Sequence, residues 1–320
     1  MDLIFSSTAA LCRRSSFYVT VAMFLLSLLA SQAQLGIRTG FVTPVSRVYY
    51  HRGPLISEPT VYVIWYGNWQ QTNRTDNAAG QQIVRDFLNA IGGSPYFAIN
   101  TSYSINSNVI TGNVSFGGET TDTGSQGKKL NDLTLVRVIT NAIVSGALPR
   151  DANGVYFVLS SSDVYELSGF CSRYCGFHRN TKILGSDIKY AFVGNPARCI
   201  RACAPQLSGP NGNAAVDGMV SIIAHELSEA TTDPDATGWY DLAHYENADK
   251  CAWTYGHHQY RAANGAWANM GWDYFDGGGS FLYHRDFMIQ RNTVRVFTKS
   301  GLQVNYCATS YDTATGKFDQ

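Results

Sequence analysis

One apolar run constrains the fold of this chain more than any other feature of its sequence. Residues 60–66 read Thr-Val-Tyr-Val-Ile-Trp-Tyr, a nearly continuous series of β-branched and aromatic side chains. A strand that is apolar on both faces is typical of a sheet covered by other elements on both sides. Residues 155–159 and 190–193 have the same character. The sequence therefore predicts a central sheet of buried strands.

Segments with helical periodicity alternate with these runs. Residues 80–92, 133–143 and 217–231 each place apolar side chains three and four positions apart, and Pro234 would end the last of them. Strands that alternate with helices indicate a layered α/β domain. We predict a mixed sheet with packed helices, followed by an irregular C-terminal part that disulfides tie down. Residues 117–129, which are polar and rich in glycine, are expected to form a loop.

The N-terminal segment has the parts of a secretory signal peptide. Arg13 and Arg14 precede the apolar residues 17–30, and Ser31-Gln32-Ala33 offers small side chains at cleavage spacing. The apolar run is short for a bilayer span, so we predict cleavage after Ala33 and no membrane span thereafter. The expected division is a signal peptide at 1–33, an irregular arm at 34–54 and a single domain at 55–320. The protein is expected to be secreted.

The charge balance excludes one class of partner. The chain has 24 Lys and Arg residues against 24 Asp and Glu residues, which gives a formal net charge of zero. A protein that binds nucleic acid generally needs excess positive charge to neutralise phosphates. We therefore expect no nucleic-acid partner.

The cysteines and sequons agree with a secreted protein. Of the seven cysteines, Cys12 lies in the signal segment and six remain, an even number that favours three disulfides in an oxidising compartment. Cysteines four positions apart share one face of a helix, so we expect the two CxxxC segments to bridge each other and the last two cysteines to pair. The six are Cys171, Cys175, Cys199, Cys203, Cys251 and Cys307. Sequons predict glycosylation at Asn73, Asn100 and Asn113.

The helix expected at residues 217–231 carries the sequence His225-Glu226-Leu227-Ser228-Glu229. His225 and Glu229 are four positions apart and project from the same helix face. In metallohydrolases of the HExxH type, the two metal ligands have this spacing and the glutamate between them activates a metal-bound water. We therefore predict that His225 and Glu229 bind zinc and that Glu226 is the catalytic base.

A third zinc ligand is expected from the acidic stretch beyond Pro234. Glu246 is our choice because it lies far enough past the helix end to turn back over the helix. Asp233 is expected to stay at the helix end, and Asp249 to be fixed by the disulfide of Cys251. Two other interpretations remain open: a histidine packed beside the core with solvated glutamates, and calcium bound by the oxygen-rich residues Asp233, Asp235, Asp241 and Glu246. The other histidines, among them His178, are expected to be surface or packing residues.

Several uncommon strings occur in order along the chain: Tyr50-His51-Arg52-Gly53-Pro54-Leu55, residues 61–69, Cys175-Gly176-Phe177-His178, Val193-Gly194-Asn195-Pro196, and residues 210–219 apart from 214 and 215. In these strings the chain resembles the EXORDIUM or phosphate-induced protein family of secreted plant proteins and its relatives outside plants. The resemblance implies an extracellular-matrix or cell-wall-associated protein linked to growth and signalling. Its expected partners are matrix or wall components, and the resemblance implies no established enzymatic activity.

The chain departs from the usual plant pattern of that family at the helix, where it carries His225, Glu226 and Glu229. Buried charges are costly to keep without a partner, so this departure favours a metal site. The alternative function is therefore a secreted zinc-dependent hydrolase, similar to a metallopeptidase. The α/β fold that we predict is zincin-like, with the HExxE helix packed beneath the mixed sheet.

Overall fold

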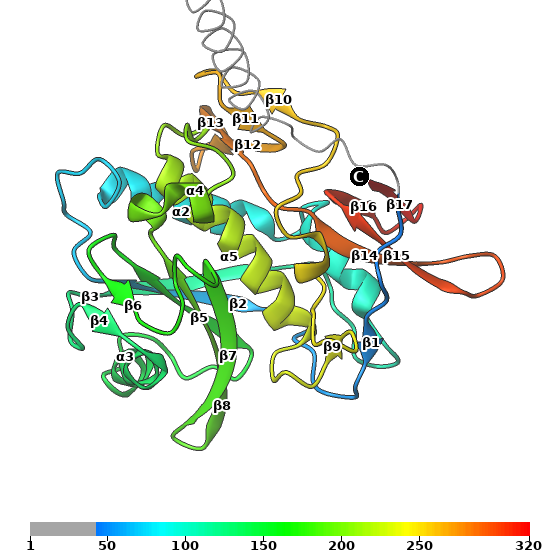
Figure 1. Ribbon diagram of the computed structural model, residues 1–320, viewed down its shortest axis with the longest axis horizontal. Helices are drawn as coiled ribbons and strands as arrows, with labels where there is room; N and C mark the ends of the chain where they lie inside the picture. Colours follow the sequence, from blue (N-terminus) through cyan, green and yellow to red (C-terminus); the bar gives the residue numbers. More distant parts are fainter. Residues whose placement is uncertain (1–42) are drawn as a thin grey trace, which may run out of the picture. The chain divides into compact units, whose positions relative to one another are not determined.

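A five-stranded sheet lies at the centre of the computed structural model, which describes residues 43–320 (Figure 1). Its strand order is β3-β2-β5-β8-β7. The first four strands run parallel, whereas β7 pairs antiparallel with β8, so the predicted mixed sheet is confirmed. The strands are β2 (Thr60–Tyr66), β3 (Ser115–Asp122), β5 (Gly154–Ser160), β7 (Gly176–Ile183) and β8 (Ser186–Gly194). The predicted signal peptide and the start of the predicted arm lie outside the described residues.

The two faces of the sheet bury different side chains of the same strand. Val63 and Trp65 of β2 belong to a core that includes helices α2 (Ala78–Ile91) and α5 (Ala214–Thr232). Ile64 and Tyr66 belong to a second core, which helix α3 (Asp132–Val144) completes. Because successive side chains of a strand point to opposite faces, a strand with apolar residues at every position needs a cover on both sides. The fold is therefore three layers, with the sheet in the middle.

Asparagine side chains begin each of the three long helices. Asn77, Asn131 and Asn213 each accept a hydrogen bond from a backbone N–H group in the first turn of α2, α3 and α5, respectively. Such caps satisfy backbone donors that have no partner within the helix. The last helix ends at Thr232, two residues before Pro234, as the sequence predicts. The shorter helical segments are η1 (Phe97–Tyr103), η2 (Pro196–Arg198), α4 (Ile200–Cys203) and η3 (Asp249–Cys251).

The C-terminal part is more regular than we predicted. It consists of antiparallel pairs, and the first four residues of β14 are buried against the core below α5. The prediction of an irregular region was wrong because short runs of alternating exposure give a weak sequence signal. The pairs are β10 (Tyr260–Arg261) with β11 (Trp267–Ala268), β12 (Met270–Phe275) with β13 (Phe281–Phe287), β14 (Asn292–Phe297) with β15 (Gln303–Ala308), and β16 (Ser310–Asp312) with β17 (Lys317–Asp319).

Two other segments differ from expectation. Residues 115–122, most of which we assigned to a loop, form the parallel edge strand β3, whose side chains alternate between exposed and half-buried. Residues 49–50 of the predicted arm form β1 (Tyr49–Tyr50), which pairs with β9 (Trp239–Tyr240) just beyond the end of α5. A further two-residue pair joins β4 (Lys129–Leu130) to β6 (Tyr165–Glu166). Within residues 43–320, no helix combines the length and apolar character that crossing a bilayer requires.

Three disulfides join the segments that the sequence analysis paired. Cys171 bonds to Cys199 and Cys175 to Cys203, so the two CxxxC segments bridge each other. Cys251 of η3 bonds to Cys307 of β15. The first two disulfides tie the start of β7 to α4, and the third ties η3 to the C-terminal hairpins. The disulfide framework was therefore predicted correctly.

One of the three sequons is unsuited to carry a glycan on the folded chain. The Asn100 side chain is fully buried, and its Oδ1 accepts hydrogen bonds from the amides of Asn247 and Asn292. A glycan on its nitrogen would have to fit inside the core, so the prediction at Asn100 is corrected. Asn73 and Asn113 are exposed, and glycosylation there stays a prediction.

Candidate metal centre

A cleft of about 430 Å³ opens beside the C-terminal half of α5. Most of its lining comes from α5, from the first residues of β7 with the segment before them, and from residues 246–253; Ala202 and Cys203 of α4 and Gln290 complete it. We call it the α5 cleft. Arg173 and Tyr174 line the cleft together with two histidines and four carboxylates, which are His178, His225, Glu226, Glu229, Glu246 and Asp249.

His225 and Glu229 lie together on α5, as helical geometry requires. The Nε2 atom of His225 is 3.1 Å from Oε1 of Glu229 and 3.5 Å from Oδ1 of Asp249. The backbone N–H of Asp249 donates to Oε1 of Glu229 at 3.0 Å, which holds the start of η3 against the helix. These three side chains offer ligand atoms that all lie within 4.8 Å of one another.

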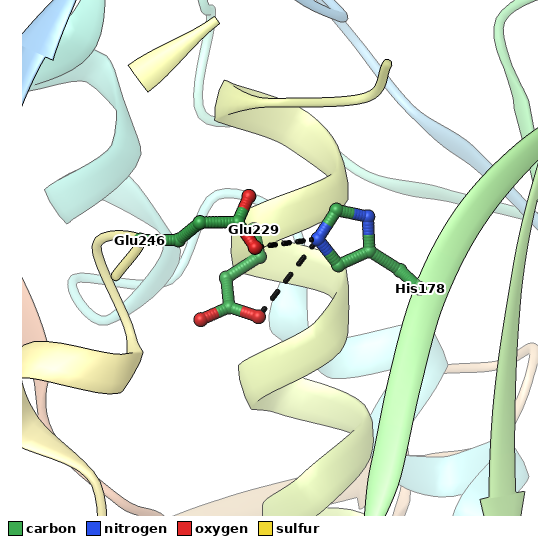
Figure 2. A group of neighbouring side chains, drawn as sticks. All are labelled: His178, Glu229 and Glu246. Carbon is green, nitrogen blue, oxygen red and sulfur yellow. Dashed lines mark hydrogen bonds and ion pairs between the residues drawn. The ribbon is translucent and has the colours of Figure 1, made fainter. Parts of the chain in front are cut away.

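A second histidine reaches the same glutamate from the sheet. Figure 2 shows His178 on β7 pointing toward Glu229 and Glu246, which come from α5 and from the segment that follows β9. Its Nε2 atom is 3.0 Å from Oε2 of Glu246 and 3.9 Å from Oε2 of Glu229. These three side chains also have ligand atoms within 4.8 Å of one another.

The structure therefore regroups the predicted ligands. His225, Glu229 and Glu246 all line the α5 cleft, but His225 and Glu246 fall in different sets of three. We expected Asp249 to be fixed by the neighbouring disulfide and His178 to be a surface or packing residue. Instead, Asp249 lies 3.5 Å from His225, and His178 lies 3.9 Å from Glu229. No sequence spacing links β7 to α5. The available signal for His178 was its place in one of the family strings.

Charge and burial oppose each other in this cleft. Burial lowers the pKa of His178, but the Glu246 carboxylate outweighs burial and raises that pKa to about 10. The pKa of His225 is likewise raised, because Glu229 and Asp249 outweigh the effect of burial. Burial raises the pKa of Glu226 and that of Glu246 to about 8. Two imidazolium groups thus offset part of the negative charge, and a metal ion would replace their protons.

Several polar atoms in the cleft have no protein partner. The Nδ1 atoms of both His178 and His225 and the Oε1 atom of Glu246 are buried without a hydrogen bond to any described residue. Glu226, which also lines the cleft, is only 4% exposed. A buried carboxylate without a donor or cation is costly, so the site is suited to a positively charged ligand.

The acidic residues behind the calcium hypothesis do not converge. Asp233 accepts a hydrogen bond from the backbone of Gly238 at the end of α5, as expected for a residue at the helix end. Asp241 pairs with Lys250, and Asp235 lies near Lys189. Of the four residues in that hypothesis, Glu246 is the one that lines the α5 cleft.

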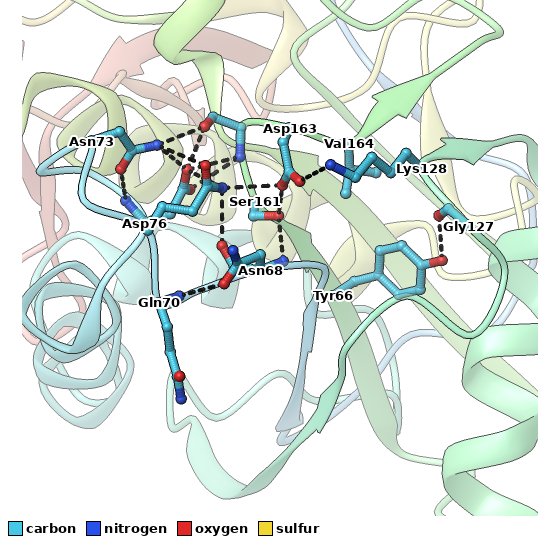
Figure 3. Close-up of polar contacts among 12 residues, drawn as sticks. Tyr66, Asn68, Gln70, Asn73, Asp76, Gly127, Lys128, Ser161, Asp163 and Val164 are labelled. Carbon is cyan, nitrogen blue, oxygen red and sulfur yellow. Dashed lines mark hydrogen bonds and ion pairs between the residues drawn. The ribbon is translucent and has the colours of Figure 1, made fainter.

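A separate polar cluster lies at the carboxyl ends of the parallel strands, where α/β sheets often bind ligands (Figure 3). The Asp76 carboxylate accepts hydrogen bonds from Asn73, Ser162 and Asn195. The Asp163 carboxylate accepts a hydrogen bond from the Ser161 hydroxyl and lies 2.8 Å from the Lys128 ammonium. Because protein donors already occupy both carboxylates, we interpret this cluster as a structural network that fixes the strand-end loops.

The fold and the site define a mixed α/β protein with three disulfides and a cleft of histidines and carboxylates. Residues 48–281 match the family model described as "Phosphate-induced protein 1 conserved region". The chain therefore belongs to the phosphate-induced protein 1 family, which confirms the predicted EXORDIUM-like resemblance. The matched range contains the two histidines and the four carboxylates of the α5 cleft.

Relatives agree with this assignment. The chain is 35% identical to Protein EXORDIUM-like 3 of Arabidopsis thaliana over 243 residues, which cover 66% of this chain and 70% of the relative. It is 35% identical to Protein EXORDIUM-like 5 of the same plant over 242 residues, which cover 65% and 64%. It is 28% identical to Protein PHOSPHATE-INDUCED 1 of Nicotiana tabacum over 222 residues, which cover 60% and 66%. Whether the HExxE helix sets this chain apart from plant members stays a prediction.

Proposed function

We propose that this protein is a secreted EXORDIUM-like protein of the extracellular matrix or cell wall that binds a divalent metal ion, zinc above all, in the α5 cleft. One observation carries the metal proposal: two imidazoles and three carboxylates from three separate segments converge at ligand distances. The disulfides and the predicted signal peptide support secretion, because such bonds persist in oxidising compartments. Matrix or wall components as partners follow from the family resemblance.

The donor atoms favour zinc over calcium. Calcium prefers oxygen ligands, whereas zinc accepts imidazole nitrogen together with carboxylate oxygen. Each set of three in the α5 cleft contains one histidine. A zincin-like fold stays part of this proposal only, as the arrangement in which a ligand-bearing helix packs against a mixed sheet.

The test is metal analysis of the purified, oxidised protein. The protein is stripped with a chelator, supplied with zinc or calcium separately, and passed through a desalting column before elemental analysis. We expect zinc to be retained and calcium to be lost. His225→Ala should weaken zinc binding by at least tenfold, because ligand loss removes a direct bond.

The chain provides a matched control in His284. This histidine also lies between two carboxylates, 2.6 Å from Asp273 and 2.9 Å from Asp286, but 46% of its side chain is exposed. His284→Ala should therefore leave zinc binding unchanged. Wild-type protein that retains no zinc after reconstitution would overturn the proposal.

Hydrolysis ranks second among the candidate functions. Glu226 lines the α5 cleft next to His225, where a general base would have to lie, but none of the names of the relatives given above states a hydrolase activity. Glu226→Gln removes the base and retains the shape of the side chain. Its predicted effect is loss of any peptidase activity with zinc still bound, which assays on a mixed peptide library would detect. Full activity in this variant would rule out Glu226 as the base, and a wild type with no activity on the library would rule out the hydrolase.

A further inference from the structure

We propose that the α5 cleft holds two divalent ions rather than one, with Glu229 as the bridging ligand. This inference rests on the proposed metal-binding function. Glu229 is the one residue shared by the two sets of three. Its Oε1 atom faces His225 and its Oε2 atom faces His178, so each oxygen has its own imidazole. A carboxylate in this position can bind one ion through each oxygen.

The spacing within each set fits one ion. Neighbouring ligand atoms around a tetrahedral zinc are about 3.4 Å apart when the bonds are about 2.1 Å long. The corresponding atoms here are 3.0 and 3.9 Å apart around His178, and 3.1 and 3.5 Å apart around His225. One ion would thus have His178, Glu229 and Glu246, and the other would have His225, Glu229 and Asp249. Paired metal sites of this kind separate the two ions by about 3.5–4 Å.

The charge of the carboxylates that line the cleft also favours two ions. Four carboxylates line the cleft, those of Glu226, Glu229, Glu246 and Asp249, and they carry four negative charges when ionised. Imidazoles that bind a metal are neutral, so one divalent ion would offset only half of this charge. Two ions offset all of it. Because charge that is buried without compensation is expensive, the second ion has a strong electrostatic reason to bind.

An unpartnered side chain provides an independent observation. Oε1 of Glu246 is buried without a hydrogen-bond partner among residues 43–320, and Glu226, which belongs to neither set of three, is 4% exposed. Its carboxylate packs beside Gly176 of β7, where a Cβ atom would lie 2.9 Å from Oε1 of Glu226. A single ion in one set would offset the charge of this carboxylate, when it is ionised, only in part. Two ions supply the positive charge that it lacks, either directly or through a water that they bind.

The experiment is a count of bound zinc per chain in the full-length secreted protein, by elemental analysis after equilibrium dialysis. We expect two ions for the wild type and for the control His284→Ala. His178→Ala and Asp249→Asn each disrupt a different set, so each should retain one ion. Glu229→Ala disrupts both and should lose both ions.

Substitution by cobalt gives a second readout. Two cobalt ions joined by a carboxylate couple magnetically, so the paramagnetic resonance signal per ion should be weaker in the wild type than in His178→Ala or Asp249→Asn. If Glu229→Ala fails to fold, these two variants still decide the question, because their residues lie outside α5. A wild-type count of one ion would overturn the two-ion site and leave the proposed metal binding intact. A count of zero would overturn both.

Discussion

Gly176 offers a direct test of how closely β7 must approach α5. A Cβ atom at this position would lie 2.6 Å from Cγ2 of Ile222 and 2.9 Å from the backbone oxygen of Phe192. Ordinary contacts begin at 3.4 Å, so Gly176→Ala must move the strand and the helix apart by about 0.8 Å. Excess volume in a packed core costs about 1–3 kcal/mol. Alanine recovers about 0.5–1 kcal/mol of strand preference relative to glycine, so the net loss lies between about 0 and 2.5 kcal/mol, and we expect a value above about 1 kcal/mol because backbone atoms are among those that must move.

The same movement should reach the proposed metal centre. His178 is two residues further along β7 and therefore lies on the same face of the strand. Its Nε2 atom is already 3.9 Å from Glu229, and displacement of the strand would lengthen that distance. Disturbing the orientation of a ligand generally costs about 10–100-fold in metal affinity. We therefore expect zinc affinity to fall by about tenfold.

Denaturant unfolding of the oxidised protein, followed by tryptophan fluorescence, measures the loss of stability. The matched control is Gly277→Ala, because a Cβ atom there meets no other atom within 4 Å. This control should stay within about 0.5 kcal/mol of the wild type. If Gly176→Ala were as stable as Gly277→Ala and bound zinc normally, the close approach of β7 to α5 would not constrain the site, and the argument would fail.

Three further predictions address other parts of the fold. Replacing Cys251 and Cys307 together by alanine opens a loop with a sequence separation of 56 residues, and chain entropy predicts a loss of about 4 kcal/mol in the free energy of unfolding; a loss below about 1 kcal/mol in denaturant titrations would contradict this. Burial raises the pKa of Asp217 to about 7, so the folded protein keeps a proton that the unfolded chain releases above about pH 4, and stability should fall as pH rises from about 4 to 7. Asp217→Asn should flatten this part of the melting-temperature profile, and an unchanged profile would assign the dependence to other groups. Glycopeptide mapping should find Asn100 unmodified, and a glycan there would mean that the η1 region is not packed as described.

The parts of the fold that the sequence predicted are those with strong local signals. The residues of β2 after Thr60 are apolar or aromatic, and apolar residues of α5 repeat at helical spacing, so the strand, the helix and the burial of both could be inferred from pattern. The sequence predicted one buried stripe on α5, whereas nearly every residue of the helix is buried. The edge strand β3 contains Gly117-Gly118 and polar side chains, which locally resemble a loop. The strand forms because it pairs with β2, which is distant in sequence. The local sequence of β3 therefore does not indicate that it is a strand.

The candidate site likewise contains residues that the sequence predicted and residues that it did not. His225 and Glu229 were predicted because a fixed spacing on one helix determines where both side chains point. His178 comes from a strand, and its contact with Glu246 spans 68 positions of sequence. Such a contact follows from the packing of β7 against α5, which a single sequence does not specify. Asp249 was rejected for its closeness to Cys251, yet the short helix η3 directs it toward His225.

The disulfides beside the α5 cleft also bear on when the cleft is completed. Cys175–Cys203 ties down the strand that carries His178, and Cys251–Cys307 ties down the short helix that carries Asp249. Only α5 lies between these walls without a disulfide of its own. In a newly made chain whose thiols are still reduced, neither wall is covalently fixed. The covalently fixed form of the cleft therefore follows oxidation of these thiols, which secretion as proposed above would provide in an oxidising compartment.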